Sequence, residues 1–111
     1  MIYTNDATKI IRKAIRTKLK EYNLKYNLIS VRHDRGTAYA WIKLRYNTDD
    51  TDTIKILDKI MISFKLYYSM YNTDEYNIKK LISPDEQDYY LKEVFIPYLE
   101  EKGINYKDLI K

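Results

Sequence analysis

The chain has 111 residues and a formal net charge of +4, with 45% hydrophobic and 32% charged residues. This length indicates one domain, residues 1–111, with a single modest core, and the balance of apolar residues and both charge signs argues against disorder. The chain has no cysteine, which excludes disulfides, thiol nucleophiles and cysteine-ligated zinc.

The charge is distributed unevenly along the chain. Residues 1–46 contain 11 Lys/Arg and 3 Asp/Glu, a net charge of +8, whereas residues 47–111 contain 9 and 13, a net charge of −4. All five arginines lie in the first part. Because a basic region attracts phosphate or acidic protein surfaces, we expect residues 1–46 to form a basic module that carries the working surface, beside an acidic helical part.

The sequence also bears on location and origin. No stretch approaches the roughly 20 apolar residues of a membrane span, and residues 1–6 lack the basic segment and apolar run of a signal peptide. We therefore expect a cytoplasmic protein with no membrane partner. Ile, Lys, Tyr and Asn make up 50 of the 111 residues, and their A/T-rich codons indicate a low-GC genome.

In chain order, residues 6–22 come first and predict an amphipathic helix. Apolar residues recur at spacings of three and four, which makes one buried stripe: Ala7, Ile11, Ala14, Ile15, Leu19 and Tyr22. The opposite side is a basic face: Lys9, Arg12, Lys13, Arg16 and Lys20. This face could follow a phosphate backbone, dock on an acidic protein groove or on the acidic part of a second copy, or simply be solvated.

Residues 27–33 and 37–46 predict a β-hairpin, because apolar and polar residues alternate along both segments. The turn is His33-Asp34-Arg35-Gly36, and Arg35 at its tip could insert into a groove. The outer face of the hairpin combines cations and aromatics: Arg32, Tyr39, Trp41, Lys43 and Arg45. Such a face can stack bases and contact phosphates or anchor a protein interface; alternatively, the C-terminal helices cover it and Trp41 is a core residue.

The remainder predicts helices. Thr51 or Asp52 can cap a helix over 53–70, and residues 72–74 can begin a short helix that ends near Ile82. Ser83-Pro84-Asp85-Glu86 predicts a capping box with proline at the first helical position, so a helix should run from 84 to about 102, kinked at Pro97 and ended by Gly103.

These elements predict an α+β fold with an N-terminal helix, an antiparallel hairpin and three to four helices packed on the sheet. A hairpin alone is marginally stable. It therefore packs on helices, takes a third strand, or joins the hairpin of a second copy in a homodimer.

Motifs for catalysis and for metal binding are lacking in the sequence. There is no G-x-S-x-G, glycine-rich phosphate loop or H-E-x-x-H pattern. Asp49, Asp50 and Asp52 lack the glycine and distal glutamate of a calcium loop, and His33 is the only histidine, which is a poor zinc signal. We expect no enzyme activity, no catalytic residue, no metal and no cofactor.

Three segments suggest a family. Ile-Ile-Arg-Lys-Ala-Ile-Arg (10–16), Ile-Ser-Val-Arg (29–32) and Trp-Ile-Lys-Leu (41–44) together resemble the small domains associated with large polyvalent proteins of phages and conjugative elements. This chain departs from that pattern in placing its tryptophan inside the strand and Arg45-Tyr46-Asn47 after it. The resemblance implies an accessory or counter-defence role in a mobile element, and it transfers no catalytic residue.

Together these features predict a small viral or mobile-element protein that binds and inhibits a host defence complex, of the anti-CRISPR or anti-restriction type, at a site that normally holds nucleic acid. Its partner would be a host protein or ribonucleoprotein. One alternative is an accessory protein that binds DNA or RNA directly. The other is a structural homo-oligomer.

Overall fold

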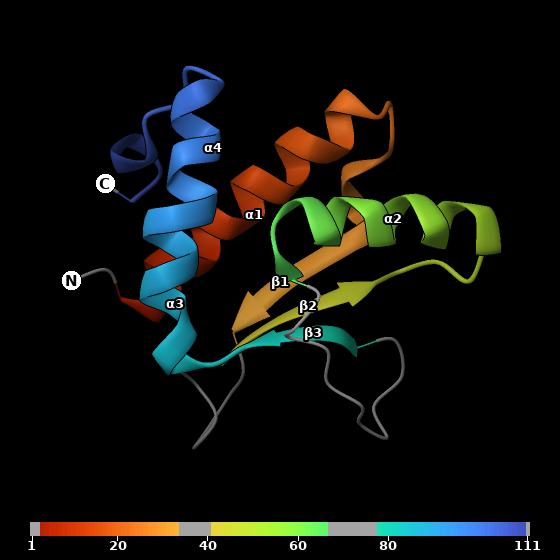
Figure 1. Ribbon diagram of the computed structural model, residues 1–111, viewed down its shortest axis with the longest axis horizontal. Helices are drawn as coiled ribbons and strands as arrows, with labels where there is room; N and C mark the ends of the chain where they lie inside the picture. Colours follow the sequence, from red (N-terminus) through yellow and green to blue (C-terminus); the bar gives the residue numbers. More distant parts are fainter. Residues whose placement is uncertain (1–2, 34–40, 67–77, 111) are drawn as a thin grey trace.

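The computed structural model describes residues 3–33, 41–66 and 78–110 and confirms the α+β class and the antiparallel hairpin (Figure 1). Its helices and strands follow one another in this order: α1 (Thr4–Glu21), η1 (Tyr26–Leu28), β1 (Ile29–His33), β2 (Ile42–Tyr46), α2 (Thr51–Ser63), β3 (Ile78–Ile82), α3 (Pro84–Tyr90), η4 (Leu91–Phe95), α4 (Ile96–Glu101) and η5 (Tyr106–Leu109).

The described strands form one antiparallel sheet in the order β1-β2-β3. Val31 lies opposite Leu44, and Ile42 lies opposite Ile82. Because successive side chains point to opposite faces, these buried residues share one face. The other face, here called the open face, presents the alternate positions: Ser30, Arg32, Lys43, Arg45 and Leu81.

Helices α1 and α2 lie on the same side of the sheet (Figure 1). The predicted stripe of α1 is buried from Ala7 to Leu19 and packs in the core with Ile29 and Val31. Tyr22 is different, because it follows the last residue of α1 and is 45% exposed. On α2, Asp58 accepts a hydrogen bond of 2.7 Å from the hydroxyl of Tyr46, a β2 residue of the buried face. The fold therefore has two layers.

The short helix predicted to end near Ile82 is wrong for residues 78–82, which form strand β3. Strand β3 pairs with β2 and buries the side chain of Ile82 in the core. A five-residue segment shows too little periodicity to distinguish strand from helix, and pairing with β2 decides between them. The chain thus supplies the third strand itself, so a second copy is not needed to extend the hairpin. The rest of that prediction, residues 72–77, lies outside the described residues.

Helix α2 begins and ends differently from the prediction. Its N-cap is Asp50, whose carboxylate accepts the Thr53 amide at 3.0 Å, and not Thr51 or Asp52. It ends at Ser63 rather than at 70. Lys65 follows with a φ of 59°, and its carbonyl accepts a 2.7 Å hydrogen bond from the Tyr90 hydroxyl. A contact from α3 therefore accompanies the end of α2; residues 67–70 lie outside the described residues.

The predicted helix from 84 is present, and α3, η4 and α4 form it without a break. Ser83 is its N-cap, but the predicted capping box does not form, because the Ser83 side chain accepts no backbone amide; its hydroxyl instead donates to the Glu86 carboxylate at 2.8 Å. Proline lacks an amide donor and crowds the preceding turn of a helix. Here the turn before Pro97 is the π-helical segment η4, a wider turn that accommodates the ring. Gly103 ends the helix at a φ of 75°, as expected.

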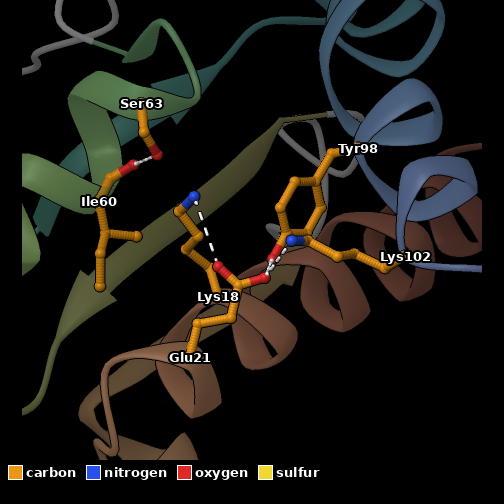
Figure 2. Close-up of polar contacts among 6 residues, drawn as sticks. All are labelled: Lys18, Glu21, Ile60, Ser63, Tyr98 and Lys102. Carbon is orange, nitrogen blue, oxygen red and sulfur yellow. Dashed lines mark hydrogen bonds and ion pairs between the residues drawn. The ribbon is translucent and has the colours of Figure 1, made fainter.

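Glu21, at the end of α1, holds the C-terminal helix (Figure 2). Its carboxylate accepts the Tyr98 hydroxyl at 2.9 Å and lies 2.8 Å from the Lys102 ammonium. Lys18 approaches the second carboxylate oxygen at 3.6 Å. The hydrogen bond from Lys102, followed by that from Tyr98 and the nearby positive charges, lowers the pKa of Glu21 below its ordinary value. Figure 2 also shows Ser63 donating to the Ile60 carbonyl oxygen at the end of α2.

The two faces of β3 predict opposite responses to truncation. Ile82→Ala should lower the free energy of unfolding by about 2 to 5 kcal/mol, because it removes a fully buried side chain. Leu81→Ala, on the open face, should cost less than about 1 kcal/mol. Urea denaturation of both variants measures the difference. Equal losses would contradict the described orientation of β3.

The contact between α1 and α4 should weaken in acid. A carboxyl whose pKa is lower in the folded than in the unfolded state stabilises the fold above its unfolded pKa of about 4.3, and this stabilisation disappears as the pH falls through the folded pKa. Glu21→Gln should therefore lower the melting temperature at pH 7, by the equivalent of about 1 kcal/mol or less for such an exposed cluster, and leave it almost unchanged at pH 3. Glu100→Gln, also an exposed carboxylate, is the control; a loss at pH 3 as large as that at pH 7 would contradict the assignment.

Candidate functional site

The site begins at the exposed edge of the sheet. Within the described sheet, β1 has a strand on one side only, so the carbonyl of Val31 faces outward. The Arg12 guanidinium donates to that carbonyl through Nε at 3.2 Å and Nη2 at 2.8 Å. This contact covers the edge and ties α1 to β1. Arg12, which the sequence predicts as part of a binding face, therefore also has a structural role.

A first groove opens beside this contact, toward the open face. Its volume is about 920 Å³, and polar and cationic side chains line it: Asn5, Arg12, Ser30, Arg32, His33, Lys43, Arg45 and Asn47. Sites for small organic ligands are lined mostly by apolar and aromatic side chains. The composition of this groove instead suits an anion.

Two further grooves continue from the first. The second follows the edge of β1 from Arg12 and Arg32 to Arg16 and Tyr26. The third lies along the outer side of α1 and shares Arg16 and Tyr26 with the second. We call the cations of the three grooves the basic surface: Arg12, Lys13, Arg16, Lys20, Lys25, Arg32, Lys43 and Arg45. Among the residues that the structure describes, no Asp or Glu lines these grooves.

The chain's own carboxylates neutralise other cations. On α1, Lys9 lies 3.9 Å from Asp6, and Lys18 lies 3.6 Å from Glu21. By contrast, no described acidic residue forms an ion pair with Arg16, Arg32 or Arg45. Burial lowers the pKa of Arg12, and the positive charges of Arg16 and Arg32 lower it further. Arginine stays protonated in proteins, so the contribution of Arg16 and Arg32, which is smaller than that of burial, means that three like charges lie close together here.

Two aromatic side chains accompany the cations. Tyr26 is 63% exposed, and the Arg16 guanidinium lies 4.9 Å from its ring centre. Trp41 is 38% exposed and directly precedes β2, where strand alternation aligns it with Lys43 and Arg45 on the open face. Trp41 is thus not a core residue, and the alternative in which the C-terminal helices seal it is wrong.

The structure brings most of the predicted site residues together. Of the α1 cations, Arg12 and Arg16 share a groove with hairpin cations at the edge of β1, whereas Lys13 and Lys20 line the third groove together with Lys25. Lys9 is paired with Asp6 and lines none of the three grooves. The predicted Arg35, with the turn tip 34–36, and Tyr39 lie outside the described residues.

Lys25 and Tyr26 are residues of the site that the sequence did not reveal. They belong to the link between α1 and β1, which has no motif that marks a binding site. Only the return of the chain across α1 places them beside Arg16. A tyrosine next to a lysine in this link is the one signal present, and it is not specific.

The described part of the chain also bears on metal binding and on membrane insertion. Across residues 3–33, 41–66 and 78–110, no group of three or more His, Asp or Glu side chains could hold a metal ion. Asp50, one of the three clustered aspartates, caps α2. None of the described helices is long and apolar enough to cross a membrane.

Comparison with known proteins gives no match, whether to a family model, to a curated protein or to a solved structure. The resemblance to the small domains of polyvalent phage proteins stays a prediction.

The structural role of Arg12 can be separated from binding. Arg12→Ala should lower the free energy of unfolding by about 1 to 3 kcal/mol, because it removes a charged donor from a carbonyl at the sheet edge. Lys13→Ala, the neighbouring exposed cation, should change it by no more than about 0.5 kcal/mol. Urea denaturation of the two variants tests this, and equal stability would show that the edge contact contributes nothing.

Proposed function

We propose that this protein is a non-enzymatic nucleic-acid-binding protein whose basic surface contacts the phosphate backbone. The observation that carries the proposal is the continuity of three grooves lined by cations, with no carboxylate among their described lining residues. Cations spread over a continuous surface repel one another in the free protein. A polyanion removes that repulsion along its whole length and releases counterions as it binds.

Guanidinium and ammonium groups both contribute to this surface. Arg16, Arg32 and Arg45 have planar forks that fit phosphate oxygens, while Lys13 and Lys20 act as mobile point charges. Phosphate contacts of this kind fix position and carry no sequence information. We therefore expect affinity for many sequences and a strong dependence on salt.

A second candidate function is inhibition of a host defence complex in the host cytoplasm. The exposed Trp41 and Tyr26 beside arginines favour it, because these residue types dominate protein interface hot spots. A channel that holds nucleic acid is itself cationic, however, and would repel the basic surface. Such a protein would therefore meet the complex at an acidic face or through its bound RNA or DNA, rather than replace the nucleic acid in its channel.

Charge reversal on the basic surface should abolish binding, and the same change elsewhere should not. Arg16→Glu with Arg45→Glu should weaken binding of a fluorescent 20-nucleotide oligonucleotide more than 10-fold at 100 mM salt, and should reduce the slope of log K against log salt by about 2. Fluorescence anisotropy measures both quantities. Neither Arg16 nor Arg45 takes part in the hydrogen bonds between Arg12 and the Val31 carbonyl.

The matched control is Lys55→Glu with Lys59→Glu on α2, which gives the same net charge away from the basic surface. We expect this pair to lose less than about 3-fold in affinity. Equal losses for the two pairs would mean that net charge alone drives binding, and an absence of binding by the unaltered protein would overturn the proposal. Light scattering at low and at high salt measures the molar mass of the protein. A larger mass at low salt would indicate self-association between the basic and acidic parts, because salt screens that attraction.

A further inference from the structure

We infer that the basic surface takes a single strand of RNA or DNA, which crosses the edge of β1 from the open face of the sheet to the outer side of α1. This inference rests on the proposed function, since it names the form of nucleic acid that the same surface holds. Three observations support it: the course of the grooves, the aromatic side chains beside them, and the contact that occupies Arg12.

The course of the grooves favours a flexible ligand. Arg32, Lys43 and Arg45 point from the open face, whereas α1 packs on the opposite face of the sheet. The grooves join these two sides around the edge of β1 through Arg12, which lines both the first and the second. A ligand that follows them must therefore turn around one strand. Duplex DNA has a persistence length of about 150 base pairs and cannot turn around a single β-strand. It can therefore lie on only one side of the sheet edge, whereas a single strand can follow the grooves on both sides.

The aromatic side chains favour unpaired bases. Tyr26 lines the second and third grooves, and the guanidinium of Arg16 lies against its ring. The exposed ring of Tyr26 offers a platform on which a base can stack while Arg16 contacts the adjoining phosphate. Trp41 lines none of the three grooves, but it is exposed directly before β2, where strand alternation places it on the open face with Lys43 and Arg45, and it offers a second platform there. Alternating cations and stacking platforms are typical of single-strand binding, whereas duplex bases have no free faces.

The contact of Arg12 with β1 also favours binding of a single strand over recognition of base edges in a duplex groove. Specific duplex recognition uses arginine forks that enter a groove and meet base edges. The Nε and Nη2 donors of Arg12 already bind the Val31 carbonyl. Arg12 can thus add positive potential at the bend, while it keeps the edge strand in place and does not reach outward.

The test compares a single strand with a duplex and uses Trp41, the only tryptophan of the chain, as an internal reporter. A 12-nucleotide oligo-dT, a 12-nucleotide oligo-U and a 12-base-pair DNA duplex are titrated into the full chain at 100 mM salt. We expect at least one single strand to bind 10-fold or more tightly than the duplex and to quench the tryptophan emission. A 12-nucleotide oligo-dU, which differs from oligo-U only in the 2′-hydroxyl, tells whether that hydroxyl contributes.

Tyr26→Ala should weaken single-strand binding about 5-fold or more, as expected for loss of one stacked base, and should leave duplex binding unchanged. Tyr89→Ala removes a tyrosine of similar exposure on α3 and is the matched control; it should not alter the affinity. Duplex binding as tight as single-strand binding, or an unchanged affinity of Tyr26→Ala, would overturn this inference and leave the proposed function standing. Binding of neither ligand would overturn both.

Discussion

The packing of α1 on β1 is the contact on which the rest of the structure depends. The apolar stripe from Ala7 to Leu19 meets Ile29 and Val31 in the core, and the guanidinium of Arg12 closes the outer edge of β1. Hydrophobic burial supplies most of the stabilisation, and the charged hydrogen bonds fix how the helix lies against the strand. Because of this arrangement the cations of α1 lie next to those of the hairpin.

The positions of the acidic residues also explain why the basic surface has no described carboxylate in its grooves. Several carboxylates serve local structure: Asp50 caps α2, Glu86 meets the cap residue of α3, and Glu21 joins α1 to α4. These carboxylates therefore have partners elsewhere and do not line the three grooves. Both α1 and α2 cover the same face of the sheet, which leaves the cations of the other face in contact with water. The separation of charge along the sequence thus becomes a separation of charge in space.

Local sequence patterns were enough to predict a helix or strand where the pattern lies within the segment itself. The stripe of α1, the alternation of β2 and the N-cap at Ser83 each concern neighbouring residues, and each of these elements is present, although Tyr22 lies just after α1 and Trp41 just before β2. Strand β3 was missed because its state depends on pairing with β2, whose residues Ile42 to Arg45 lie far earlier in the chain than their partners Ile82 to Ile78. The length of α2 was overestimated: the helix ends at Ser63, and the carbonyl of Lys65, two residues later, accepts the Tyr90 hydroxyl. The sequence predicts a kink at Pro97; the structure has a π-helical turn, η4, directly before α4, which the sequence pattern did not indicate.

The sequence by itself determined that this is an α+β domain with its net positive charge in residues 1–46, because charge and periodicity are properties of the chain alone. Only the tertiary structure decided which of those cations act together. In the folded chain Lys9 and Lys18 form ion pairs with neighbouring acids, and Arg12 binds the edge of the sheet. Lys25 and Tyr26 lie beside Arg16. The physical reason is that electrostatic and stacking interactions act over a few ångströms in space, and the distance between two side chains is set by how helix and sheet pack.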